Sequence, residues 1–105
     1  SGGYNTSRLV LTFPGKFKAI AIQSASYATC LGPVCAIPNT LPAHHPPTLI
    51  LHGGRDMTVP LFTALWFEEV LQANGVEVKT LVNPSIGHGW LPESPEAVLD
   101  WFETH

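Results

Sequence analysis

Two segments of the chain combine glycines with side chains that can hold or move a proton. In residues 52–60, Asp56 follows a Gly-Gly-Arg turn, and in residues 83–90, His88 lies between two glycines. A carboxylate beside an imidazole fixes the tautomer of the ring and stabilises its charged form while the histidine acts as a general base. Flanking glycines let the loop bend and leave the ring open to a reacting group. Asp56 and His88 are therefore the first candidates for catalysis.

Both segments follow stretches that predict β-strands. Residues 48–52 are mostly apolar, as expected of a strand covered on both faces, and residues 76–82 alternate in polarity. A short apolar strand is also expected at residues 17–23. Because the carboxyl ends of adjacent parallel strands meet at one edge of a sheet, Asp56 and His88 are expected to lie side by side.

Helical patterns fill the gaps between these strands. Residues 4–12 precede a Pro-Gly stop, and the helix after residue 58 ends at Asn74-Gly75. Ser94 is expected to cap the last helix. The alternation of strands and helices predicts an α/β fold with a parallel sheet. The expected buried residues of the last two helices are Leu61, Phe62, Leu65, Trp66, Val70 and Leu71, and then Val98, Trp101 and Phe102.

Composition narrows the classes of function. A chain of 105 residues that is 45% hydrophobic, with a net charge of −3, predicts one small folded unit. Its five Lys and Arg are scattered, so nucleic-acid binding is not expected. No apolar run approaches the roughly 20 residues of a membrane span. The chain opens without Met or a signal-type segment, and we interpret it as a piece of a longer protein.

The opening residues match the surroundings of a catalytic serine. A nucleophile elbow reads Gly-x-Ser-x-Gly on a strained strand-to-helix turn, and the chain begins Ser1-Gly2-Gly3. With Asp56 and His88 downstream, the order is serine, aspartate, histidine.

These motifs resemble those of the α/β-hydrolases over nearly the whole chain. Residues 51–60 are similar to the acid-bearing turn after the seventh strand of esterases and related peptidases, and residues 84–90 to their histidine loop. The opening Ser-Gly-Gly-Tyr-Asn-Thr is similar to the elbows of secreted esterases, polyhydroxyalkanoate-depolymerase-like enzymes and prolyl-oligopeptidase relatives. The resemblance implies that residues 1–105 form the carboxyl-terminal part of one α/β-hydrolase catalytic domain, a parallel sheet flanked by helices.

The nucleophile itself has two possible registers. These families often read Ser-x-Gly-Gly-x-x-Thr from the nucleophile onward. Matching Gly2, Gly3 and Thr6 to that pattern places the nucleophile just before this chain and makes the Ser1 amide an oxyanion donor. The alternative register, Ser-x-Gly, makes Ser1 the nucleophile; the Gly-Gly-Tyr match favours the first register.

The implied activity is hydrolysis of carboxylic esters through a Ser-Asp-His triad and an acyl-enzyme, without a cofactor. The expected partners are an ester substrate and an upstream amino-terminal segment of the same hydrolase, on the same or a separate chain. Trp90 is the first candidate for an acyl-chain contact, with loop packing as the alternative. Two other interpretations are a prolyl-oligopeptidase-like peptidase and a non-catalytic fragment that needs a complementary chain.

The two cysteines indicate the cellular compartment of the protein, and the remaining histidines are candidates for metal binding. Cys30 and Cys35 flank a Gly-Pro pair and could close a tight loop as a disulfide, which would indicate a secreted or periplasmic protein; two free thiols are the alternative. No further ligands complete a metal site with them. His44 and His45 could bind a metal with His52, but a proline-rich loop holds ligands poorly, so no metal is expected.

Each candidate also has a plainer interpretation. Asp56 could cap the helix that follows it, and His88 could be an ordinary loop histidine; their joint placement after strands favours catalysis. His52 is expected to pack beneath the acid turn. The open edge of the first strand is expected to expose Ile20 and Ile22 to water.

Overall fold

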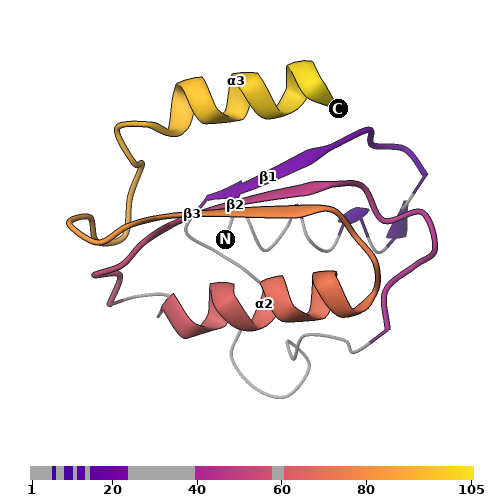
Figure 1. Ribbon diagram of the computed structural model, residues 1–105, viewed down its shortest axis with the longest axis horizontal. Coiled ribbons are helices and arrows are strands. Elements are labelled where there is room, and N and C mark those ends of the chain that lie inside the picture. The colour runs from indigo at the N-terminus through magenta and orange to yellow at the C-terminus, as the bar shows by residue number, and fades with distance from the viewer. Residues whose placement is uncertain (1–5, 7–8, 11, 14, 24–39, 58–60) are drawn as a thin grey trace.

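Three parallel strands form the sheet of the computed structural model, which describes residues 6, 9–10, 12–13, 15–23, 40–57 and 61–105. In chain order, the elements are β1 (Ile20–Gln23), β2 (Thr48–Gly53), α2 (Leu61–Ala73), β3 (Val78–Asn83) and α3 (Ser94–Thr104). The strand order is β1-β2-β3, and Gly53 pairs with Asn83 in register, so the carboxyl ends of β2 and β3 lie together (Figure 1). The predicted parallel α/β arrangement is confirmed.

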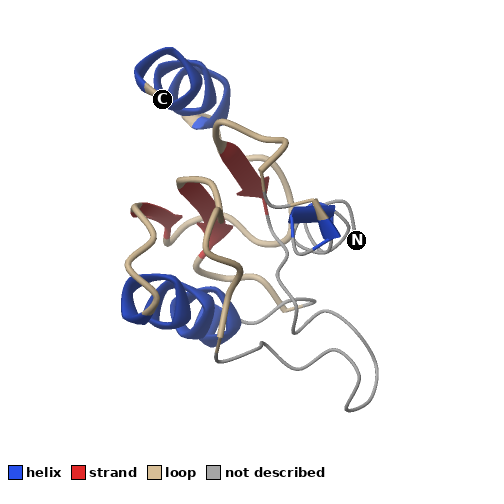
Figure 2. Ribbon diagram, turned by 90° about the vertical axis from the view of Figure 1, so that its right-hand side faces the viewer, coloured by secondary structure: helices blue, strands red, loops and turns tan. Residues whose placement is uncertain are grey.

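The central strand β2 is buried at every position because a helix covers each of its faces. Figures 1 and 2 show α2 and α3 on opposite sides of the sheet. Ile50 packs with the α2 side chains, and Leu49 and Leu51 pack with Trp101 of α3. Burial of each such side chain stabilises the fold by about 1.5–3 kcal/mol. This rigid strand fixes the starting point of the turn that carries Asp56.

The face that α2 buries agrees with the prediction only in part, because Val70 and Leu71 are buried as expected. Phe67 shares its face with Val70 and Leu71, three and four residues further along the helix, and this face covers the sheet. Phe62, Leu65 and Trp66 lie off this face and are exposed, contrary to the prediction. The expectation that Trp66 belongs to the core is therefore wrong. The predicted helix stop is confirmed, since Gly75 has φ of 73° directly after the last turn.

Helix α3 begins differently from the prediction. Glu93 is its N-cap residue, without a side-chain capping hydrogen bond, and Ser94 is the first helical residue. The expected cap at Ser94 is therefore wrong, because the helix begins one residue earlier and Ser94 already lies inside it. Trp101 is buried as predicted, but Phe102, one residue further around the helix, is exposed.

Strand β1 is shorter than predicted and better covered. It spans Ile20–Gln23, and Ile20 and Ile22 are only 4% and 0% exposed. The predicted exposure of these two side chains is wrong. Both point from the face of the sheet into a core that they share with Val10 and Ile50. Only the backbone of β1 faces an edge without a partner strand among the described residues.

Several sequence predictions lie outside the described residues: Ser1 with its glycines, the Cys30–Cys35 pair and the first turn expected for α2 at residue 58. Among the helices that are described, none has the length and apolarity to cross a membrane.

Candidate active site

The turn that carries Asp56 packs directly against the histidine loop. It begins at Gly53, where β2 ends, and the Asp56 amide donates to the Gly53 carbonyl at 3.1 Å. A Cβ atom at Gly53 would collide with the carbonyl oxygens of Ile86 and Gly87. Only glycine allows the two backbones this close, so the turn and the loop form one unit.

Backbone hydrogen bonds join these segments at two points. The Gly54 amide donates to the Asn83 carbonyl at 2.8 Å, and the Arg55 amide donates to the Ile86 carbonyl at 3.0 Å. The first bond extends the pairing between β2 and β3, whereas the second fixes the loop two residues before His88.

Asp56 and His88 meet at this junction, as their placement after adjacent strands predicts. His88 Nδ1 lies 2.9 Å from Asp56 Oδ2, and the Asp56 side chain is fully buried while that of His88 is 43% exposed. A carboxylate can only accept a hydrogen bond, so Nδ1 carries the proton and donates. Nε2 is then the ring nitrogen left for proton transfer with a substrate or nucleophile.

A second imidazole contacts the same carboxylate oxygen. His52, fully buried on β2, places Nε2 3.5 Å from Asp56 Oδ2. Asp56 therefore lies between two histidines, one buried and one facing solvent. The sequence pattern placed His52 beneath the acid turn but did not indicate this contact; its spacing of four residues from Asp56 was the available signal.

Two large apolar side chains stand in solvent beside the pair. Met57, directly after Asp56, is 92% exposed, and Trp90, two residues after His88, is 70% exposed. Trp90 was singled out from the sequence, whereas Met57 was not, and the acyl-chain role of Trp90 stays a prediction.

The histidines near the second strand do not form a metal centre. The described residues contain no group of three His, Cys, Asp or Glu side chains able to hold an ion. His45 directs Nδ1 to the Pro46 carbonyl oxygen at 2.9 Å, and burial lowers the pKa of its imidazole.

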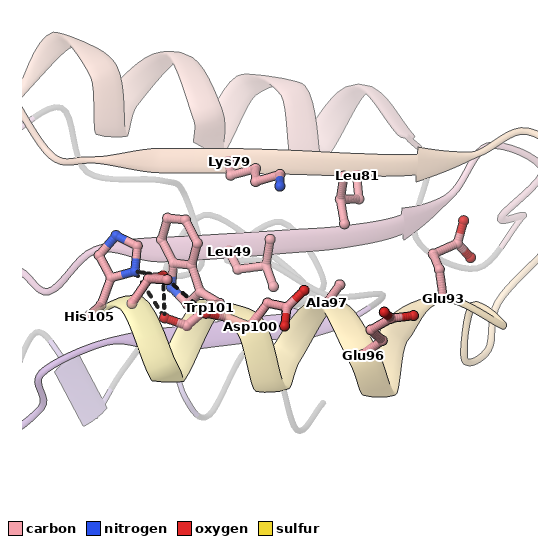
Figure 3. Close-up of a pocket in the computed structure, with 10 residues that line it drawn as sticks. Leu49, Lys79, Leu81, Glu93, Glu96, Ala97, Asp100, Trp101 and His105 are labelled. Atoms are coloured by element: carbon pink, nitrogen blue, oxygen red, sulfur yellow. Dashed lines mark hydrogen bonds between the residues drawn. The ribbon is translucent and has the colours of Figure 1, made fainter.

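A groove of about 390 Å³ lies elsewhere, between α3 and β3 (Figure 3). Helix α3 packs on β1 and β2, which leaves the near face of β3, with Lys79 and Leu81, partly uncovered. Neither Asp56 nor His88 is among the residues that line it. These are Leu49, Lys79, Leu81, Glu93, Glu96, Ala97, Asp100, Trp101, Thr104 and His105.

Gly53→Ala should displace the histidine loop. The added methyl group meets backbone oxygens, which cannot move by a rotamer change, so we expect a loss of stability of about 1–3 kcal/mol. We also expect a fall in catalytic rate of roughly tenfold or more, because His88 shifts with the loop. Gly15→Ala, where a Cβ meets no atom within 4 Å, is the matched control. Equal thermal midpoints for the two variants would contradict this account.

Comparisons with known proteins show what the chain is similar to. The chain is 51% identical to a poly(3-hydroxyoctanoate) depolymerase from Pseudomonas fluorescens over 105 residues, which is 100% of this chain and 38% of the depolymerase. A crystal structure of an acetyl ester-xyloside bifunctional hydrolase from Caldicellulosiruptor lactoaceticus matches with 28% identity and a TM-score of 0.46, over 61% of this chain and 24% of its own.

The family follows from a separate match. The model of the prolyl oligopeptidase family, a family of hydrolases, matches residues 33–105, which contain β2, β3, Asp56 and His88. The parallel sheet with a helix on each face is part of an α/β-hydrolase fold. The chain belongs to the prolyl oligopeptidase family.

Proposed function

We propose that this chain carries the acid and the base of a Ser-His-Asp triad in a serine esterase. The observation that carries the proposal is the 2.9 Å contact between a buried Asp56 and a solvent-facing His88 at the carboxyl ends of parallel strands. The third member is the serine expected at the start of the chain, at Ser1 or directly before it, with the Ser1 amide as an oxyanion donor in the second case.

The proposed reaction has two halves. The serine oxygen attacks the ester carbonyl carbon while its proton moves to His88 Nε2, and the tetrahedral intermediate collapses as that proton passes to the leaving alcohol. Water then attacks the acyl-serine while its proton moves to His88 Nε2. His88 returns that proton to the serine oxygen as the second tetrahedral intermediate collapses, which releases the carboxylic acid and regenerates the serine. Asp56 holds the ring through Nδ1 and stabilises the imidazolium in both halves.

The substrate we propose is an ester with an apolar acyl group, of the kind found in aliphatic polyesters. Two observations support it: the depolymerase relative acts on such a polymer, and Met57 and Trp90 expose apolar surface beside the acid and the base. A peptide substrate is the second candidate, because the family model that matches the chain is that of prolyl oligopeptidase.

A substrate panel with the complete enzyme distinguishes these candidates. We expect hydrolysis of p-nitrophenyl octanoate and of a polyester suspension, and no release of p-nitroaniline from prolyl peptide anilides. Trp90→Ala should raise the KM for the octanoate ester and leave that for the acetate ester unchanged. Trp66→Ala, at a partly exposed tryptophan on α2, is the matched control. Faster cleavage of the anilides than of the esters would identify a peptidase instead.

We also propose that the protein is exported and that Cys30 and Cys35 form a disulfide. Disulfides persist in oxidising compartments, and the Gly-Pro pair between the cysteines suits a closed loop. The intact mass should therefore rise by about two units on reduction, one hydrogen for each sulfur. Alkylation of both thiols in the unreduced protein would contradict the disulfide and remove the support for export.

A further inference from the structure

One side chain at the carboxyl end of β1 reaches the histidine loop and the start of α3. Gln23, the last residue of β1, donates from Nε2 to the Gly89 carbonyl oxygen at 2.9 Å. Its Oε1 accepts from the hydroxyl of Ser94 at 2.7 Å. The amide of this one residue therefore connects β1 to the histidine loop and to α3. The residues it contacts there lie 66 and 71 positions further along the sequence.

The orientation of this amide follows from its partners. The Gly89 carbonyl can only accept a hydrogen bond, so it faces the NH₂ group. Ser94, whose side chain is buried, donates its hydroxyl hydrogen to Oε1, which as an amide oxygen can only accept. A glutamate at position 23 would still accept from Ser94 but would turn its second oxygen toward the Gly89 carbonyl. The site therefore fits an amide better than a carboxylate of the same length.

His88 lies between two anchors that come from different strands. On its amino-terminal side, Ile86 accepts from the Arg55 amide of the turn after β2. On its carboxyl-terminal side, Gly89 accepts from Gln23 of β1. Because Gly89 follows His88 directly, loss of the second anchor would loosen the loop on the carboxyl-terminal side of the imidazole.

We propose that Gln23 is a positioning residue for His88. It fixes the backbone of the histidine loop so that the ring keeps its 2.9 Å contact with Asp56 and presents Nε2 to the serine. The proposal rests on the proposed function, in which His88 is the general base. Displacing a reacting group by about 1 Å can reduce the rate by about 100-fold, so a side chain that touches no substrate can have a large kinetic effect.

The test compares two variants of the complete enzyme on p-nitrophenyl butyrate. Gln23→Leu removes both hydrogen bonds, and Gln23→Glu keeps the acceptor for Ser94 while losing the donor to Gly89. For both, kcat is expected to fall by about 10- to 100-fold with KM within twofold of wild type. The downfield proton NMR signal of His88 Nδ1–H should also broaden or disappear. Gln72→Leu, at an exposed glutamine of α2, is the matched control.

The outcomes separate positioning from general support of the fold. A kcat within threefold of wild type in either folded variant overturns the proposal, even if the thermal midpoint falls. Failure of both variants to fold also overturns it, because Gln23 would then act on stability alone. His88→Ala, measured beside them, tests the proposed function separately: an active His88→Ala enzyme refutes the function, whereas an inactive one beside active Gln23 variants refutes only the role of Gln23.

Discussion

Replacing His88 with alanine in the complete enzyme is expected to lower ester turnover by about 10⁴-fold or more, with the fold intact. The imidazole is 43% exposed and donates one hydrogen bond to Asp56, so its removal leaves no large cavity. Without it, no base remains in place to take the proton of the serine. Asp56→Asn should have an effect of similar size, because an amide can donate to Nδ1 and so favour the wrong tautomer.

The measurement is kcat/KM on a soluble ester together with the thermal midpoint of each variant. His44→Ala and Asp100→Asn remove one histidine and one carboxylate that are exposed and away from the pair, and both are expected to keep wild-type rates. Because Asp56 is buried, Asp56→Asn could also lower stability; the rate of the folded enzyme is then the relevant comparison. Activity within tenfold of wild type for either His88→Ala or Asp56→Asn would refute the triad assignment.

The position of the acid and the base was predictable because it depends on topology. Residues 48–52 contain three consecutive large apolar side chains, as expected of a strand with both faces covered, and β2 is buried throughout. Once β2 and β3 are adjacent and parallel, the segments that follow them meet at one edge. The contact between Asp56 and His88 follows from this arrangement without knowledge of any side-chain detail.

The close contacts around the pair were not predictable in the same way. The sequence drew attention to Gly87 and Gly89 beside the histidine, yet a Cβ at either position meets nothing closer than 3.7 Å. The glycines that the packing requires are Gly53 and Gly54 in the acid turn. Which glycine is needed depends on how near another backbone comes, and this distance is set by tertiary packing rather than by the local pattern.

The buried face of a helix and the hydrogen bonds between distant side chains were also not predictable from the local sequence. Two apolar stripes compete on α2, and the one with Phe67 wins because it meets the sheet, whereas Trp66 stays in solvent. Ser94 has the sequence context of a helix cap but donates to Gln23, 71 residues away. Where a helix begins and which of its faces meets the sheet depend on tertiary packing, which the local sequence pattern does not specify.

The second prediction concerns how activity depends on the segment expected upstream of the chain. We expect the 105-residue chain alone to give no hydrolysis of p-nitrophenyl butyrate above the buffer rate, and the protein extended by an upstream segment with the elbow strand to be active. The resemblance places the nucleophile at Ser1 or just before it, on a turn that a strand must support. Within the described residues, β1 pairs only with β2, so its other edge is free to bind a further strand.

The same open edge predicts how the short chain behaves. Ile20 and Ile22 are already buried, so the unpaired backbone of β1, rather than an apolar surface, is what favours association between copies. The chain alone should therefore aggregate or melt without a cooperative transition, whereas the extended protein should melt sharply. An extended His88→Ala protein is the control, because it regains the strand but not the base. A monomeric, cooperatively melting and active sample of the 105 residues would contradict both the need for the upstream strand and a nucleophile located before Ser1.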